Sequence, residues 1–291
     1  MQSCPPPDSQ PKKPRFALPP KACDAVCHVI GPRSRFAFSP ERKYDVPDSP
    51  FEELARLHAV LGIHRAALVQ ATVHGADNSA MLDALERSGG RYKGVAILDG
   101  SESDAELGRL DRAGVCGLRF NFVRMLGGPP DARMFHRIVA RIADLGWHIA
   151  LHVGGDDLME HEASLRKLGV PVVIEHMGRV DIAQGLQQPS FVRMLDLMKQ
   201  DGFWVKIDMG DRLSVTGPPY RDVIPFAQAI VDAAPERVLW GSDWPHPMYQ
   251  GGKPMPNDGD LVDLFGAYVP DPALREQILV TNAATLYRFD G

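Results

Sequence analysis

Histidines and carboxylates stand where short apolar runs begin or end, and these are the residue types that activate water. In Asp24-Ala25-Val26-Cys27-His28 the alternate residues Asp24, Val26 and His28 are expected to share one face of a strand. A hydrolase that grips a divalent ion between two alternate histidines of one strand would need a histidine where Val26 stands. Half of that metal grip is therefore missing, although His28 remains.

Two further groups could carry acid-base chemistry. Asp243 follows the apolar or small residues 238–242, and a carboxylate there must be paired, hydrogen-bonded or catalytic. The alternative interpretation is a helix cap before Trp244-Pro245. His176 follows the apolar run 172–174 and Glu175, and its alternative is a structural histidine. We expect Asp243 to draw a proton from water, with His176 and His28 beside it.

The arginines point to an anionic ligand. Arg119 and Asn121 share a face at the end of one apolar run, and His152 ends the next. A buried guanidinium is costly unless an anion meets it, either a protein carboxylate or a substrate one, and for Arg119 we expect the substrate. Arg124 and Arg212 are candidates for further clamps, each with a solvated surface arginine as its alternative.

A metal site is the competing hypothesis. One ion could bind to His28, His152, His176 and Asp243, and zinc or manganese would suit that donor set. With Val26 in place this set is poorer, so we expect a site without a metal and no cofactor.

The elements that position these residues alternate regularly. Apolar runs predict eight strands, at 22–30, 65–71, 93–99, 116–122, 147–153, 171–176, 203–209 and 237–243. Helical periodicity marks a stretch from residue 51, where Leu54, Leu57 and Leu61 recur, and the ranges 78–88, 103–113, 131–145, 157–168, 190–201 and 221–234. This pattern predicts an α/β fold, a (β/α)₈ TIM barrel whose site lies at the carboxyl ends of the strands. A doubly wound sheet is the alternative, but Gly31-Pro32-Arg33 is not its glycine-rich turn.

Composition bounds the rest. Residues 1–20 hold seven prolines and predict an N-terminal arm, and residues 21–291 of the 291 predict one catalytic barrel. A net charge of −5 disfavours nucleic acid as a partner, and no apolar run is long enough to span a membrane. Four cysteines without CxxC spacing favour reduced thiols and a cytoplasmic protein. A homo-oligomer is possible.

A series of motifs spread over the strand ends carries a resemblance to a known family. The motifs are Asp24–Pro32, Phe38-Ser39-Pro40, Lys43-Tyr44, Val69-Gln70-Ala71, His74-Gly75 with Asp77-Asn78, Gly117–Phe122, Glu175–Arg179, Asp211-Arg212-Leu213 with Gly217-Pro218-Pro219, and Gly241–Pro247. With these the chain resembles the lactonase branch of the amidohydrolase superfamily, and within it the 2-pyrone-4,6-dicarboxylate lactonases of aromatic catabolism. The resemblance implies a metal-independent lactonase with Asp243 as general base, and His28 and His176 polarising the lactone carbonyl.

The same resemblance implies that Arg119, Arg212 and Tyr44 hold substrate carboxylates, with His74 among the substrate-binding positions. Three departures stand out: Val26 replaces a family histidine, Met125 stands where the family has a loop arginine with Arg124 one place early, and His152 replaces a tyrosine. The expected function is hydrolysis of a carboxylated lactone, such as a pyrone dicarboxylate or a muconolactone. Two alternatives stay open, a metal-dependent hydrolase or decarboxylase and a non-catalytic binder of anionic metabolites.

Overall fold

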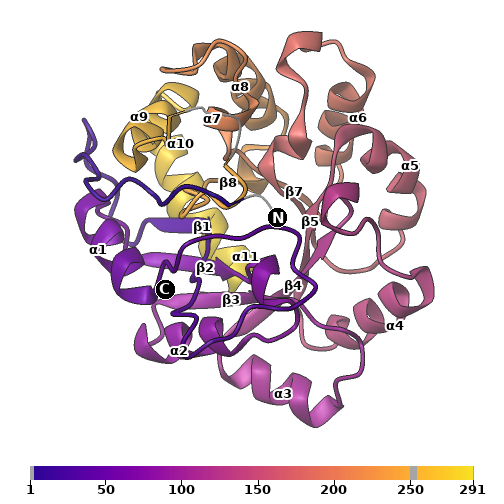
Figure 1. Ribbon diagram of the computed structural model, residues 1–291. Helices are drawn as coiled ribbons and strands as arrows, with labels where there is room; N and C mark the ends of the chain where they lie inside the picture. Colours follow the sequence, from indigo (N-terminus) through magenta and orange to yellow (C-terminus); the bar gives the residue numbers. More distant parts are fainter. Residues whose placement is uncertain (1–2, 250–253, 291) are drawn as a thin grey trace.

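Eight parallel strands form the centre of the molecule (Figure 1), in a computed structural model that describes residues 3–249 and 254–290. The strands pair in chain order and are β1 Cys23–Cys27, β2 Arg65–Val69, β3 Tyr92–Ala96, β4 Val115–Asn121, β5 His148–His152, β6 Val172–Ile174, β7 Phe203–Lys206 and β8 Val238–Leu239. Backbone bonds from Ala25 N to Trp240 O and from Asp243 N to Val26 O, both 2.8 Å, join the last strand to the first. The predicted (β/α)₈ barrel is confirmed, and each strand lies within one residue of its predicted range.

Helices surround the strands (Figure 1). The longer ones are α1 Phe51–Leu61, α2 Ser79–Arg87, α3 Asp104–Arg112, α4 Ala132–Ala143, α5 Gly155–Leu165, α6 Pro189–Met198, α8 Ile224–Ala233 and α9 Asp258–Tyr268. Shorter helices are α7 Gly210–Leu213, α10 Pro272–Glu276 and α11 Ala283–Tyr287. No helix was predicted over α7, α9, α10 or α11.

Helix α4 illustrates why these segments are helical. Asp131 caps its first turn by accepting a hydrogen bond from the Met134 N–H, at 2.9 Å. Phe135, Ile138 and Ile142 recur at helical spacing and are buried against the barrel. The apolar stripe and the cap together fix the helix over the β4 and β5 strands.

Strand β1 departs from simple alternation, and this corrects one expectation. The pairing with β2 shifts between Asp24 and Cys27, so three residues of β1 span the length of two in β2. Val26 packs into the apolar cluster inside the barrel, whereas Asp24 lies beside His58 of the surrounding helix α1. The prediction that Asp24 shares a face with Val26 and His28 is therefore wrong, because the bulge turns Asp24 outward.

The N-terminal segment is docked on the barrel. Lys12 forms an ion pair with Asp260 at 2.6 Å, and its backbone N–H donates to the Asn257 side chain at 2.9 Å. Further toward the N-terminus, Cys4 N–H donates to Asp45 O at 2.9 Å. The division into an arm at 1–20 and a barrel at 21–291 stays a prediction.

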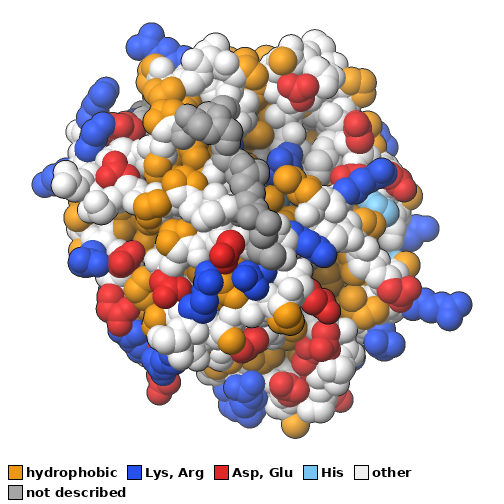
Figure 2. Space-filling model, in the orientation of Figure 1, with side chains coloured by type: hydrophobic (Ala, Val, Ile, Leu, Met, Phe, Trp, Pro, Cys, Tyr) orange, Lys and Arg blue, Asp and Glu red, His pale blue; other side chains and the backbone are white. Residues whose placement is uncertain are grey.

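All four cysteines are free and buried thiols. Within residues 3–249 and 254–290, none of the helices combines the length and the apolar character needed to cross a bilayer. Figure 2 shows acidic and basic side chains interspersed over one face of the molecule.

Buried histidines make the stability depend on pH. Burial, and next the charge of Lys206, lower the pKa of His148 to about 3, and burial with Arg119 does the same for His28. Such a ring is neutral in the folded protein but takes up a proton on unfolding below its ordinary pKa near 6.5. The stabilisation is complete above pH 6.5 and is lost as the pH falls toward 3.

We therefore expect the free energy of unfolding to fall by about 2 kcal/mol per such histidine between pH 7 and pH 5. Chemical denaturation across this range measures it. In His148→Leu the free energy of unfolding should depend less steeply on pH, because unfolding then takes up about one proton fewer. An unchanged slope in His148→Leu would show that His148 does not titrate as described.

Candidate active site

A cavity of about 130 Å³ opens at the carboxyl ends of the strands. It is lined by His28, Tyr44, Thr72, Arg119, Met125, Leu126, His152, His176, Arg179, Met209, Arg212, Leu213, Asp243, Pro247 and Met248. Seven of these residues were singled out from the sequence as site residues: His28, Tyr44, Arg119, His152, His176, Arg212 and Asp243. The barrel thus collects residues from distant parts of the chain at one mouth, as the fold requires.

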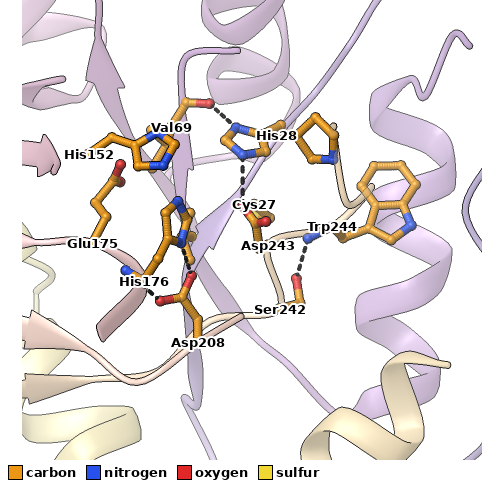
Figure 3. Close-up of polar contacts among 12 residues, drawn as sticks. Cys27, His28, Val69, His152, Glu175, His176, Asp208, Ser242, Asp243 and Trp244 are labelled. Atoms are coloured by element: carbon orange, nitrogen blue, oxygen red, sulfur yellow. Dashed lines mark hydrogen bonds and ion pairs between the residues drawn. The ribbon is translucent and has the colours of Figure 1, made fainter. Parts of the chain in front are cut away.

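Asp243 and His28 face each other across this mouth (Figure 3). His28 Nε2 lies 3.1 Å from Asp243 Oδ1, and His28 Nδ1 lies 2.7 Å from the carbonyl oxygen of Val69. Burial and the charge of Arg119 lower the pKa of His28 to about 3, so the ring is neutral and has one N–H. That proton belongs on Nδ1, where the carbonyl accepts it, and the lone pair of Nε2 faces Asp243.

Arg212 contacts the other oxygen of the same carboxylate. Its Nη2 pairs with Asp243 Oδ2, and its Nη1 donates to Pro247 O at 2.9 Å. Asp243 is buried, with 3% of its side chain exposed, and Arg212 is partly buried, with 16% exposed. Arg212 therefore lies over the proposed base and narrows the cavity.

His176 is fixed by Asp208, which follows β7. Asp208 accepts from the His176 backbone N–H at 3.0 Å and lies 2.6 Å from His176 Nδ1 (Figure 3). Residue 176 has a positive φ of 58°, which a non-glycine residue keeps only when its contacts hold it. The other ring nitrogen, Nε2, takes no part in these two contacts, and the His176 side chain lines the cavity. The backbone between His176 and Arg179 stays left-handed throughout.

Arg119 is balanced by a protein carboxylate. Its Nε donates to Glu175 Oε2 at 3.0 Å, and the fully buried Lys206 donates to Glu175 Oε1 at 3.1 Å. Burial alone would raise the pKa of Glu175, but the charges of Arg119 and Lys206 hold it well below its usual range. This buried triad holds two cations against one carboxylate and leaves a positive excess beneath the cavity.

His152 lies between two guanidinium groups. Its Nδ1 is 3.5 Å from Arg119 Nη2 and its Nε2 is 3.3 Å from Arg179 Nη1. Burial, His176 and Arg119 lower the pKa of His152 well below 6.5, so the ring is neutral and has one lone pair for two donors. One of the two contacts therefore places a guanidinium N–H against the N–H of the His152 ring.

Arg179 has no carboxylate partner within the described residues. Burial, and next the charge of Arg212, lower its pKa. Arg179 belongs to the Glu175–Arg179 motif but was not among the predicted site residues. Its position could have been foreseen from the loop after strand six, because that loop also carries His176.

Three predicted site residues lie outside the cavity lining. His74 is buried, its Nε2 accepts from Gly31 N–H at 3.2 Å, and its Nδ1 lies 3.0 Å from Ala37 O. Arg124 is exposed, and Met125 and Leu126 line the cavity in its place. Asn121 ends β4 partly buried, and its Oδ1 has no hydrogen-bond partner. Tyr44 does line the cavity and lies 3.0 Å from Thr72 Oγ1.

The donor set fits a metal ion poorly. His176, Asp208 and Asp243 offer atoms within 4.8 Å of one another, but Asp208 already accepts two bonds from His176. Arg212 occupies Asp243, and the lone pair of His28 Nδ1 is replaced by a proton donated to Val69 O. A divalent cation here would also face the charge of Arg179. The side chains are therefore arranged for anions.

The chain is similar in sequence to a known protein family and to curated lactone hydrolases. The amidohydrolase family model matches residues 23–289. The chain belongs to the amidohydrolase family. It is 45% identical to a 2-pyrone-4,6-dicarboxylate hydrolase from Comamonas testosteroni, over 96% of this chain and 94% of that protein. It is 41% identical to 4-sulfomuconolactone hydrolase from Hydrogenophaga intermedia, over 94% of this chain and 90% of the relative.

Solved structures share the fold. An Acinetobacter baumannii protein assigned as a 2-pyrone-4,6-dicarboxylic acid hydrolase, with citric acid bound, superimposes with a TM-score of 0.80 at 26% identity. The match covers 92% of this chain and 100% of that one. The recognised resemblance to the lactonase branch of the amidohydrolases is confirmed.

The Arg119, Glu175 and Lys206 triad can be tested through stability. Glu175→Gln leaves two buried cations without a counter-charge, which typically costs about 3 to 5 kcal/mol. We expect a loss of that size in the free energy of unfolding measured by chemical denaturation.

The matched control is Asp196→Asn, which breaks the exposed pair with Lys199. An exposed pair is worth less than about 1 kcal/mol. Equal effects of the two substitutions would contradict the assignment of Glu175 as the counter-charge.

Proposed function

We propose that this protein hydrolyses a lactone bearing at least one carboxylate or comparable anionic group, in the breakdown of aromatic compounds. The observation that carries the proposal is the juxtaposition of Asp243 and His28 with three guanidinium groups in one cavity. Relatives named as lactone hydrolases, at 41% and 45% identity over most of the chain, support the same reaction. The names of both relatives describe anionic ring esters, a dicarboxylate and a sulfonate.

In the proposed reaction Asp243 removes a proton from a water molecule as the water oxygen attacks the lactone carbonyl carbon. The protonated carboxyl group then donates to the lone pair of His28 Nε2, 3.1 Å away. When the ring C–O bond breaks, the proton passes from Asp243 to the leaving oxygen. His28 thus serves Asp243 in this proposal, rather than polarising the carbonyl.

His176 is the proposed partner of the carbonyl oxygen. A ring that carries a proton on both nitrogens donates one to Asp208 and the other to the negative charge that develops on that oxygen. Asp208 fixes the ring through two contacts, so little reorganisation is needed when the charge develops.

We propose that the anionic groups of the substrate bind to Arg179 and Arg212. Arg119 lines the same cavity, where its hydrogen bond to Glu175 holds it in place. Arg212 is shared between Asp243 and the ligand, so a substrate carboxylate would draw it from Asp243 and enlarge the cavity. An anion beside Arg179 would also relieve the donor-to-donor contact at His152. Because Val26 replaces the family histidine, the carboxyl end of strand β1 offers His28 but no second histidine to contact the substrate.

We also propose that the reaction needs no metal ion, since guanidinium groups and hydrogen bonds already engage the carboxylates. Zinc or manganese held by His28, His152, His176 and Asp243 remains the competing proposal.

Asp243→Asn tests the proposed base. Loss of a general base typically costs about 100- to 10,000-fold in rate, so we expect kcat to fall by that factor on carboxylated pyrones and muconolactones. Ultraviolet absorbance follows ring opening, and calorimetry with the unreacted lactone checks that binding survives. The wild-type rate should be unchanged by a chelator.

Two results would contradict this account. Undiminished hydrolysis by Asp243→Asn would remove Asp243 as the base. Loss of wild-type activity with chelator and its return with zinc would favour the metal-dependent alternative.

Arg179→Met tests the anion clamp, with Arg124→Met as the matched control because Arg124 is exposed outside the cavity. A hydrogen bond to a charged group contributes about 1.5 to 3 kcal/mol. We expect KM to rise roughly 10- to 100-fold in Arg179→Met and to stay within about twofold in Arg124→Met. The reverse order of effects would restore Arg124 as the clamp.

A further inference from the structure

A chain of buried polar side chains lies behind Asp243, on the side away from the cavity. It runs from Tyr92 of β3 through His58 of α1 and Asp24 of β1 to Ser242, the residue before Asp243. All four side chains belong to residues less than 4% exposed, and none of them lines the cavity. The reaction proposed above uses none of these groups.

Asp24 is the centre of this chain. Its Oδ1 accepts from the backbone N–H groups of Ser242, at 2.9 Å, and Val26, at 3.2 Å. Its Oδ2 accepts from the Ser242 hydroxyl at 2.5 Å and lies 3.3 Å from His58 Nε2. A fully buried carboxylate with four donors is satisfied in place, so it is a rigid anchor.

His58 and Tyr92 complete the anchor. His58 Nδ1 lies 2.7 Å from the Tyr92 hydroxyl. Since Nε2 faces a carboxylate, a neutral ring carries its proton there and accepts the Tyr92 O–H at Nδ1. Every donor in this arrangement then meets an acceptor.

Ser242 links Asp24 to the backbone on both sides of Asp243. Its hydroxyl oxygen donates to Asp24 and accepts from the Trp244 N–H at 3.1 Å (Figure 3), so the residues on both sides of Asp243 are fixed. Asp243 itself has a left-handed φ of 57°, which a non-glycine residue adopts at a cost of about 1 to 3 kcal/mol. This backbone conformation therefore depends on its surroundings.

The close contact between Ser242 and Asp24 also explains why residue 241 is a glycine. A Cβ at this position would lie 2.5 Å from Val26 Cγ1 and 2.8 Å from Asp24 Oδ1. The bulge in β1 and the missing side chain at 241 let the β8 end approach Asp24 closely. Cys27, Asp24 and His58 also offer atoms within 4.8 Å of one another, but both Asp24 oxygens are already occupied by N–H and O–H donors.

We propose that Asp24, braced by His58 and Tyr92, is a positioning residue that holds Asp243 in its reactive orientation through the hydroxyl of Ser242. The proposal rests on the proposed function for its catalytic consequence. It extends the site outward to helix α1 and strand β3, neither of which supplies a residue to the cavity lining.

Ser242→Ala is the first test, because it removes both bonds of the hydroxyl and leaves the cavity lining intact. A misplacement of about 1 Å typically costs about 100-fold in rate. We expect kcat to fall roughly 10- to 100-fold while KM stays within about threefold. In a crystal structure of Ser242→Ala, we expect the distance between Asp243 Oδ1 and His28 Nε2 to lengthen.

The control is Ser103→Ala. The Ser103 hydroxyl likewise accepts from a backbone N–H, that of Glu106 at 3.2 Å, at the N-terminus of α3, and Ser103 belongs neither to the cavity lining nor to the Asp24 cluster. It should lose comparable stability in thermal unfolding with kcat unchanged. An equal fall of kcat in both variants would overturn the proposal, since the loss would then follow stability alone.

His58→Gln and His58→Leu give a second pair, useful if Ser242→Ala does not fold. Glutamine can keep an N–H donor toward Asp24 and leucine cannot. We expect His58→Gln to keep at least tenfold more kcat than His58→Leu, at similar KM. Equal kcat in the two variants overturns the proposal.

The crystallographic measurement separates this inference from the proposed function. If wild-type protein opens no lactone but Asp243 moves in Ser242→Ala, the function is wrong and the positioning stands. If the wild-type protein is an active lactonase and Asp243 keeps its 3.1 Å contact with His28 in Ser242→Ala, the positioning role is wrong and the function stands.

Discussion

The guanidinium groups collected at the barrel mouth impose the constraint on which the rest of the site depends. Charges removed from water need partners, and Arg119, Arg212 and Arg179 find them to different degrees. Glu175 balances Arg119 but is shared with Lys206, and Asp243 balances Arg212. Among the residues that the structure describes, Arg179 meets a neutral histidine and no carboxylate. The site is therefore short of negative charge, and in our proposal an anionic substrate supplies it.

The same constraint supports the proposal that the reaction needs no metal ion. A divalent cation and a guanidinium group compete for the same carboxylate, and here Arg212 pairs with Asp243. Asp243 is left with an acceptor on one side, His28 Nε2, and a movable cation on the other, Arg212. In our proposal this carboxylate takes a proton from water once the ligand draws Arg212 away.

The fold and much of the site follow from the sequence because both depend on local patterns. Alternating apolar runs located all eight strands, and the rule that barrel sites lie at carboxyl strand ends located Asp243, His176 and His28. What escaped prediction depends on irregular backbone. The bulge in β1 reversed the expected direction of Asp24, and loop conformation turned Arg124 outward and brought Met125 and Arg179 into the lining. His58 was not among the predicted site residues, and its contact with Asp24 joins positions 34 apart in the chain.

The most direct test is a crystal structure of the protein with an open-chain dicarboxylate that mimics the hydrolysed product. The account predicts that Arg212 leaves Asp243 to bind one ligand carboxylate, that Arg179 binds another, and that Asp243 faces the newly formed acid group. A ligand whose carboxylates meet no guanidinium, with Arg212 still on Asp243 or a metal ion between His176 and Asp243, would contradict it.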